Sequence, residues 1–144
     1  FTLYLAAGYL DSEANELQLI CDGSDDCEGS PLFWAPEWSG AVVLDAYFPM
    51  GSGAITGSLE AFYEGERGGD WTATRENYID AYTEMALRVG YESESNWYVE
   101  AYVENLTDEF TWDGQNINGG VLPSHFFGPK RPRTFGMRLG MTWD

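Results

Sequence analysis

The chain has 144 residues, of which 44% are hydrophobic, 16% aromatic and 22% charged, so it is long enough for one domain of ordinary size but not for two. With 7 Lys and Arg against 24 Asp and Glu, its formal charge of -17 opposes binding to nucleic-acid phosphates or to anionic lipid headgroups. The chain contains no run of about 18 apolar residues, so no membrane-spanning helix is predicted, and no segment has the pattern of a secretion signal.

The first predicted strand runs from Phe1 to Leu10 and alternates apolar with other side chains from its first residue. A chain that opens inside such a run is predicted to be a fragment that begins in mid-strand. The long connection from Asp11 to Glu37 follows, and it contains Cys21 and Cys27.

The segment between the two cysteines is short, polar and contains one Gly, which predicts a small disulfide-bonded loop and an oxidising compartment. Two free thiols in an acidic loop are the alternative. A third possibility is a calcium site made by carboxylates, but the spacing is not that of a standard calcium loop, so no metal is predicted. The carboxylates concerned are Asp22, Asp25, Asp26 and Glu28.

Five further strands are predicted from a period of two in the apolar residues. They are Trp38 to Phe48, Ala54 to Glu64, Asn77 to Tyr91, Asn96 to Asn105 and Thr134 to Trp143. The connections 49–53 and 92–95 are tight turns, whereas 11–37, 65–76 and 106–133 are long. Membrane barrels have short turns at one rim and long loops at the other, so we expect both short turns to share one rim.

Each strand has an apolar and a polar face, and every charge within a strand falls on the polar one. In a membrane barrel the polar face lines the lumen. We expect Arg88 and Arg138 to pair with acids of this lining. The predicted lumen-facing residues are Asp45, Glu60, Asp80, Glu84, Arg88, Glu100, Glu104 and Arg138.

The aromatic residues of the apolar face are predicted to gather at the strand ends, as two girdles at the membrane interfaces. The long-loop rim would hold Tyr9, Trp38, Tyr63 and Phe135, and the short-turn rim Phe1, Phe48, Tyr91, Trp97 and Trp143. Six strands are too few to close such a barrel, because the smallest class has eight. The sequence therefore predicts an all-β fold, an antiparallel up-and-down transmembrane β-barrel portion of about six strands.

Several segments, in their order along the chain, resemble the C-terminal end of a TonB-dependent outer-membrane receptor. Asn105-Leu106-Thr107-Asp108-Glu109 follows an alternating strand, and Pro132-Arg133-Thr134-Phe135-Gly136-Met137-Arg138-Leu139-Gly140 leads towards the chain end. Upstream, Tyr9-Leu10-Asp11-Ser12-Glu13 and Ala35-Pro36-Glu37-Trp38-Ser39-Gly40 fit the family's strand-end and strand-start patterns. One departure is that Asp144 follows Trp143, where the family usually ends on an aromatic residue.

The resemblance implies that residues 1–144 are the last six of 22 strands, with the plug domain and the earlier strands absent. It implies a bacterial outer-membrane location and energised uptake of a scarce nutrient, such as an iron chelate, cobalamin or a glycan. The implied partners are outer-membrane lipid, the inner-membrane TonB complex acting through the missing plug, and a small-molecule or oligosaccharide ligand. No nucleic acid, cofactor or enzymatic activity is implied.

Residues of the long connections are candidate ligand contacts, because their aromatic rings can stack on sugars or catecholates or simply pack the loops together. These candidates are Trp34, Trp112, His125, Phe126 and Phe127. A single histidine gives little support to acyl-transfer catalysis, and no catalytic residue is predicted. The rival prediction is a secreted, soluble β-sandwich that binds carbohydrate through its loop aromatics.

Overall fold

The computed structural model describes residues 1–13, 15, 31–32, 34–69, 78–116 and 126–143. Within these residues the secondary structure is entirely β. Six long strands form one antiparallel sheet in the order β1-β2-β3-β6-β7-β10. They are β1 (Thr2–Tyr9), β2 (Trp38–Pro49), β3 (Gly53–Glu64), β6 (Tyr82–Ser93), β7 (Trp97–Glu104) and β10 (Thr134–Met141).

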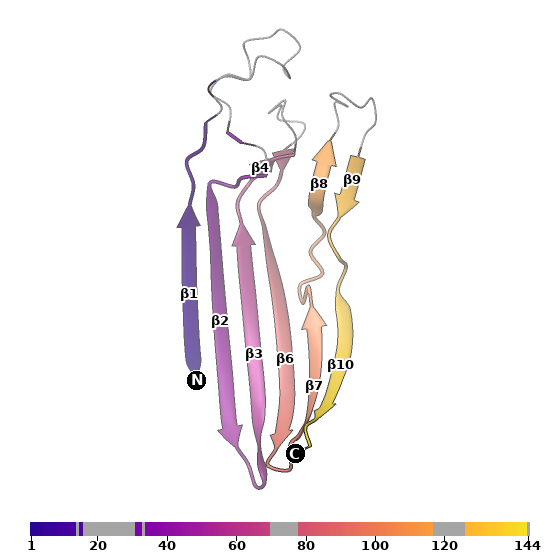
Figure 1. Ribbon diagram of the computed structural model, residues 1–144. Helices are drawn as coiled ribbons and strands as arrows, with labels where there is room; N and C mark the ends of the chain where they lie inside the picture. Colours follow the sequence, from indigo (N-terminus) through magenta and orange to yellow (C-terminus); the bar gives the residue numbers. More distant parts are fainter. Residues whose placement is uncertain (14, 16–30, 33, 70–77, 117–125, 144) are drawn as a thin grey trace.

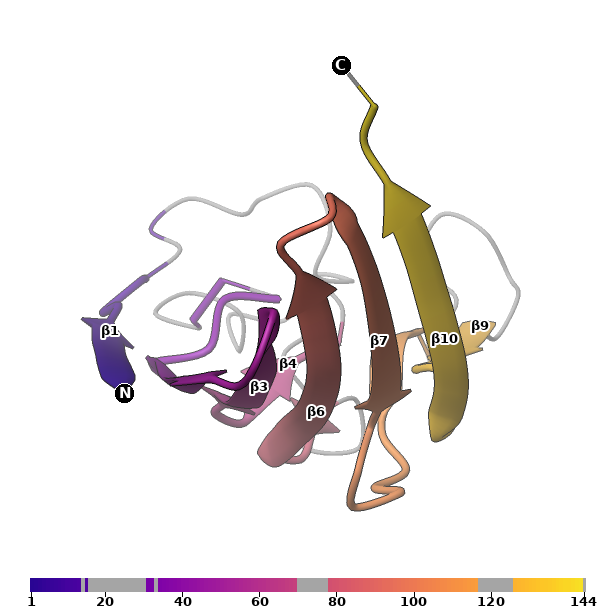
Figure 2. The same ribbon diagram turned by 90° about the horizontal axis from the view of Figure 1, so that it is seen from below.

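These six strands confirm the predicted up-and-down order, since the long strands that follow one another in the chain are also neighbours in the sheet. Figure 1 shows them side by side, and in Figure 2 the sheet follows a curve from β1 to β10. Both short turns lie at the same end, as predicted (Figure 1). At the first, the Met50 amide donates to the Gly53 carbonyl over 2.8 Å, and Gly51 has a φ of 61° that few residues other than glycine adopt.

Two small hairpins extend the long connections at the other end (Figure 1). β4 (Arg67–Gly68) pairs with β5 (Tyr78–Ile79), and β8 (Trp112–Asn116) pairs with β9 (Phe126–Pro129). The predicted strand from Asn77 to Tyr91 is therefore wrong at its start, because Tyr78 and Ile79 belong to the β4–β5 hairpin and the long strand begins only at Tyr82. Asp80 lies between the two strands and outside the large sheet, so strand alternation does not assign it to a face, and its place on the polar face stays a prediction.

The strand register keeps the two faces separate across the whole sheet. One row of directly paired residues is apolar in all six strands: Leu3, Leu44, Leu59, Leu87, Val103 and Phe135. The row begins at the second residue of β1 and ends at the second residue of β10, although these strands run in opposite directions. The strands are thus staggered, which is the shear that a tilted barrel wall requires.

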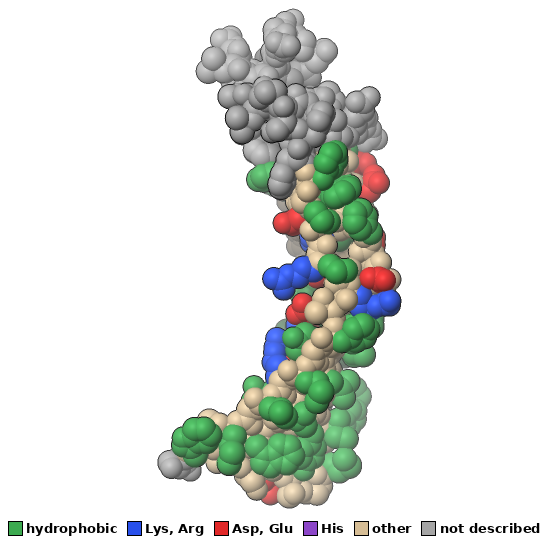
Figure 3. Space-filling model, turned by 90° about the vertical axis from the view of Figure 1, so that its right-hand side faces the viewer, with side chains coloured by type: hydrophobic (Ala, Val, Ile, Leu, Met, Phe, Trp, Pro, Cys, Tyr) green, Lys and Arg blue, Asp and Glu red, His purple; other side chains and the backbone are tan. Residues whose placement is uncertain are grey.

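Other described residues cover little of either face of the sheet, and they do so mainly around Tyr82, where Lys130 lies over the ring. Only Ala54, Ile79, Tyr82 and Ala86 are buried hydrophobic residues in this part of the chain, whereas Leu59 is 36% and Leu139 77% exposed. Viewed from the β10 side, hydrophobic side chains gather over the lower part of the sheet and again near its upper end, and most of the charged side chains lie between (Figure 3). The sandwich prediction is wrong in its architecture, because the six strands form one sheet and not two packed sheets.

Ring contacts join neighbouring strands at both ends of the apolar face. Tyr9 and Trp38 lie 4.8 Å apart between ring centroids at the long-connection end. Phe1 packs edge-on against Phe48 at 5.2 Å. Tyr91 lies 5.5 Å from Trp97 near the second short turn. None of the described residues forms a helix long and apolar enough to cross a membrane.

Candidate functional site

The polar face carries cross-strand ion pairs at mid-sheet. Arg88 of β6 donates to Glu60 of β3, and Arg138 of β10 donates to Glu100 of β7 over 3.1 Å. The Arg138 guanidinium also lies 4.8 Å from the ring centroid of Tyr102, a distance suited to a cation–π contact. These acids therefore each hold a cation of a neighbouring strand, which neutralises charge in a region with little other packing.

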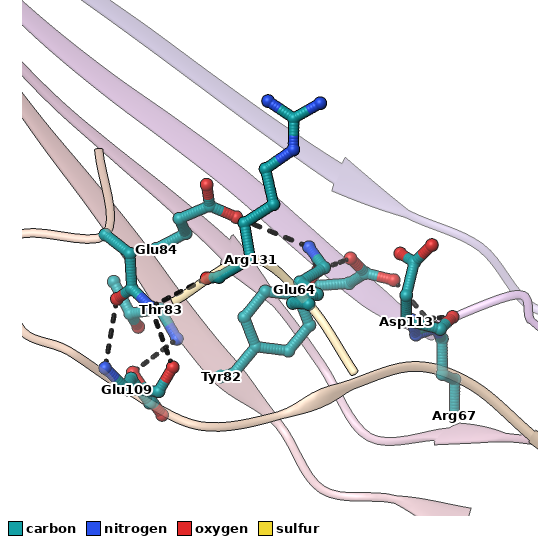
Figure 4. Close-up of polar contacts among 10 residues, drawn as sticks. Glu64, Arg67, Tyr82, Thr83, Glu84, Glu109, Asp113 and Arg131 are labelled. Atoms are coloured by element: carbon teal, nitrogen blue, oxygen red, sulfur yellow. Dashed lines mark hydrogen bonds and ion pairs between the residues drawn. The ribbon is translucent and has the colours of Figure 1, made fainter. Parts of the chain in front are cut away.

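A second polar cluster lies where the strands meet the long connections, and we call it the collar: Glu64, Arg67, Tyr82, Glu84 and Lys130. The Tyr82 hydroxyl donates to Glu64, and the Lys130 ammonium donates to the Tyr82 oxygen and lies 3.4 Å from the Glu84 carboxylate. Figure 4 shows Glu64, Tyr82 and Glu84 pointing towards one another from β3 and β6. The collar joins two strands to the segment after β9.

Arg67 is the most deeply buried charged residue of the collar, at 5% exposed. Its Nε lies 2.9 Å from Glu64, and its Nη2 donates to the Asp113 carbonyl over 3.1 Å. Its Nη1 has no hydrogen-bond partner among the described residues. Through Arg67, the β4–β5 hairpin is attached to the β8–β9 hairpin, and Gln115 strengthens this link by donating to the Tyr78 carbonyl over 2.8 Å.

Asn105 ties the outgoing and returning arms of the last long connection. Its side-chain amide donates to the carbonyls of Glu109 and Arg131 at 2.9 and 3.2 Å, and its oxygen accepts from the Glu109 amide at 3.0 Å. The residue is 6% exposed and has a φ of 50°, a conformation that Asn tolerates better than most residues. Asn105 thus fixes the start of this connection, and the Glu109 carboxylate accepts from the Thr83 amide of β6 over 3.3 Å (Figure 4).

The pKa of Lys130 is shifted by its surroundings. Burial lowers it, but the Tyr82 hydroxyl and the carboxylates of Glu84 and Glu64 raise it by more, so the pKa lies above the ordinary lysine value. Lys130 therefore stays charged at physiological pH and holds the collar as a cation.

The structure separates the basic residues near the start of β10. Lys130 belongs to the collar, Arg131 is exposed with Nη1 at 4.0 Å from Glu104, and Arg133 binds Asp108 at 3.2 Å and lies over the Phe135 ring. Each of these three cations therefore lies beside a carboxylate.

Three of the predicted ligand contacts have described side chains. Trp112 lies 4.9 Å from Phe110 and 5.2 Å from Phe127 between ring centroids, edge-on to the first and tilted to the second, so the three rings form a small aromatic cluster at the β8–β9 hairpin. Trp34 is exposed, and its backbone amide donates to the Gly68 carbonyl over 2.8 Å. Cys21, Cys27, His125 and the side chain of Phe126 lie outside the described residues, as do the acids of the possible calcium site.

Two hollows open near the long connections. One of about 590 Å³ is lined by four carboxylates together with Arg67, Trp38 and Tyr63. The other, of about 580 Å³, lies beside Phe62, Tyr82 and Lys130. No group of three or more His, Cys, Asp or Glu in the described part of the chain is arranged to hold a metal ion. The four carboxylates are those of Asp11, Glu13, Glu37 and Glu66.

The collar and the Asn105 contacts were not predicted from the sequence. Tyr82 and Arg67 occur in no motif. Glu64 is only three residues from Arg67, but the other contacts of Tyr82 and Arg67 join residues 18 to 48 positions apart along the chain. The sequence marks Asn105 only as a strand end and as the first residue of the segment Asn105–Glu109. Its position just after an alternating strand, followed by Asp108, is the one local signal for a turn at this place.

No protein-family model and no curated protein matches the sequence. Among solved structures, the chain is similar to the ferric yersiniabactin uptake receptor FyuA from Yersinia pestis, with a TM-score of 0.68 and 18% sequence identity. The similarity covers 81% of this chain and 18% of that chain, so the chain spans less than a fifth of the receptor's length. At this identity the comparison shows the fold, part of an antiparallel β-barrel.

Proposed function

We propose that this chain forms part of the wall of an outer-membrane β-barrel receptor that takes up a scarce nutrient. The observation that carries the proposal is the continuous apolar row from Leu3 to Phe135 on an uncovered sheet face. Large exposed apolar surfaces are unfavourable in water but are suited to contact with lipid. The likeness in fold to an uptake receptor supports the same reading.

In this proposal the opposite face lines the lumen and the long connections face outward. The cross-strand ion pairs place the charged side chains of that face next to one another and away from lipid. This arrangement is typical of a water-filled or plugged barrel interior. The residues assigned to the lumen are Asp45, Glu60, Glu84, Arg88, Glu100, Glu104 and Arg138.

The family resemblance extends the proposal to the whole receptor. Residues 1–144 would be the C-terminal part of a TonB-dependent receptor, whose plug domain couples ligand uptake to the inner-membrane TonB complex. We propose a ferric chelate as the first ligand class to test, with cobalamin and glycans as the alternatives. The candidate contacts are Trp34, Trp112, His125, Phe126 and Phe127, of which Trp112 and Phe127 already stack together.

The experiment uses the full-length protein in its native cells. We expect it in the outer-membrane fraction, resistant to carbonate extraction, and we expect labelled ligand to accumulate only while the proton-motive force is maintained. Ferric chelates, cobalamin and oligosaccharides are compared in the same assay, with a deletion strain as control. Recovery of the protein in the soluble fraction would refute the membrane location, and uptake that is unchanged after deletion would refute the receptor role.

A further inference from the structure

The polar face of β7 and β10 has a complementary pattern of side chains. Along β7 the pattern is Tyr98, Glu100, Tyr102, and along β10 it is Gly136, Arg138, Gly140. The antiparallel register sets Tyr102 opposite Gly136, Glu100 opposite Arg138 and Tyr98 opposite Gly140. Each tyrosine thus lies opposite a residue without a side chain, and Glu100 lies opposite Arg138.

The tyrosine rings occupy the space that the glycines leave free. A Cβ placed on Gly136 would overlap the outer end of the Tyr102 ring, and a Cβ on Gly140 would overlap the ring of Tyr98. An aromatic ring that covers a glycine on the neighbouring strand shields its backbone and restores packing that glycine lacks. Between the two rings, Arg138 binds Glu100 at 3.1 Å and lies 4.8 Å from the Tyr102 ring centroid.

The apolar face of the same two strands does not define their register. Its direct pairs are all apolar, and a slip of two residues keeps every side chain on its own face while replacing one apolar pair by another. These pairs are Trp97–Met141, Val99–Leu139, Ala101–Met137 and Val103–Phe135. Hydrophobic burial or lipid contact therefore distinguishes poorly between the native and the slipped arrangement.

The polar face distinguishes the native register from a register slipped by two residues in either direction. A shift of two residues sets Arg138 opposite a tyrosine and Glu100 opposite a glycine, so the direct ion pair is lost and both glycines lose the tyrosine opposite them. We propose that the match of Tyr-x-Glu-x-Tyr on β7 with Gly-x-Arg-x-Gly on β10 selects the register of this strand pair. This inference rests on the sheet register and does not depend on the proposed function.

The test measures register directly by cysteine cross-linking in the full-length protein, with Cys21 and Cys27 replaced by Ser. The pair Ala101→Cys with Met137→Cys reports the native register. Ala101→Cys with Leu139→Cys and Ala101→Cys with Phe135→Cys report the registers slipped by two residues in the two directions. We expect the native pair to dominate, and we expect Gly136→Ala with Gly140→Ala to lower the native-to-slipped ratio about tenfold. Gly57→Ala is the control, because a Cβ there meets no atom closer than 3.8 Å. A ratio unchanged by the two alanines would overturn the proposal.

Two further variants separate this effect from a general loss of folding. The double variant Tyr98→Ala with Tyr102→Ala should also lower the native-to-slipped ratio. Combining it with Gly136→Ala and Gly140→Ala should lower the ratio little further, because both double variants remove the same tyrosine–glycine contacts. Arg138→Glu should lower the ratio, and Arg138→Glu with Glu100→Arg should restore it. Fully additive effects, or no restoration by the charge exchange, would contradict the proposal.

Discussion

The strongest test of the membrane assignment uses two adjacent residues at the middle of β3. Ser58 and Leu59 point to opposite faces, because Ser58 pairs with Asp45 and Arg88, whereas Leu59 pairs with Leu44 and Leu87. Arginine at position 59 would enter the apolar row. Arginine at position 58 would meet one acid and one base on the polar face. The two substitutions add the same side chain at the same height in the sheet, so they differ only in the face that receives the charge.

The expected magnitude follows from the length of β3. Its 12 residues span roughly 36 Å at about 3.3 Å per residue, and a tilt of about 40° reduces this to roughly 28 Å across the membrane. The apolar band of an outer-membrane barrel is about 25 Å tall, so Leu59 lies near its middle. An arginine there costs about 2–4 kcal/mol, which lowers the folding equilibrium constant roughly 30- to 900-fold. Ser58→Arg is expected to change the free energy of unfolding by less than about 0.5 kcal/mol.

The assay is reversible unfolding of the full-length protein in phosphatidylcholine vesicles, with the free energy of unfolding measured for wild type, Leu59→Arg and Ser58→Arg. A third variant, Tyr63→Arg, changes the same face nearer the long-connection end and is expected to cost only about 0–1 kcal/mol for its charge, because the penalty decreases towards the interface. Equal effects of the substitutions at 58 and 59, or a larger cost at 63 than at 59, would refute a lipid-facing apolar row centred on Leu59.

Three further predictions concern the polar contacts. Arg88→Met should lower the free energy of unfolding by about 2 kcal/mol, because it leaves Glu60 unpaired. The double variant Glu60→Met with Arg88→Met should lower it by less, and a double-mutant cycle measures the difference. Asn105→Ala should cost about 2 kcal/mol through its lost hydrogen bonds, and Asn105→Gly, which keeps the positive φ accessible, should cost less in the same unfolding assay. Because the folded-state pKa of Lys130 is raised, its stabilising contribution should be complete below the ordinary lysine pKa and disappear as pH rises through the folded-state value. The difference in the free energy of unfolding between Lys130→Met and wild type should therefore shrink only in alkaline solution, and a difference that shrinks between pH 6 and 9 would contradict this.

The six long strands could be predicted because their signal is local and repeated. In β7, for example, Trp97, Val99, Ala101 and Val103 alternate with Tyr98, Glu100 and Tyr102, and this parity alone assigns each residue to a face. The same parity failed at 77–81, where an apparently continuous alternation joins β5 to β6. Tyr78 and Ile79 pair with Arg67 and Gly68 instead, and no local pattern reports such a partner.

The β8–β9 hairpin could not be predicted for a different reason. Its strands are five and four residues long and contain Gly114, Gly128 and Pro129, residues that normally argue for a loop. The hairpin is held by contacts from elsewhere, such as Arg67 donating to the Asp113 carbonyl and Gln115 donating to the Tyr78 carbonyl. Residues of the candidate site that act through such long-range contacts leave no periodic trace in the sequence.

The two faces of the sheet therefore carry different kinds of information. The apolar face specifies only that its residues avoid water, and Leu, Val, Met or Phe serve this purpose almost equally in the row that ends at Phe135. The polar face contains side chains that require particular partners, because an unmatched charge or an uncovered glycine has a cost wherever packing is sparse. Contact with lipid then determines which side chains of a strand lie on the outer face. Pairs such as Glu60 with Arg88 and Glu100 with Arg138 determine the register between that strand and its neighbour. A sheet with almost no buried core needs the second kind of information most, since it has no interior packing to correct a shifted strand.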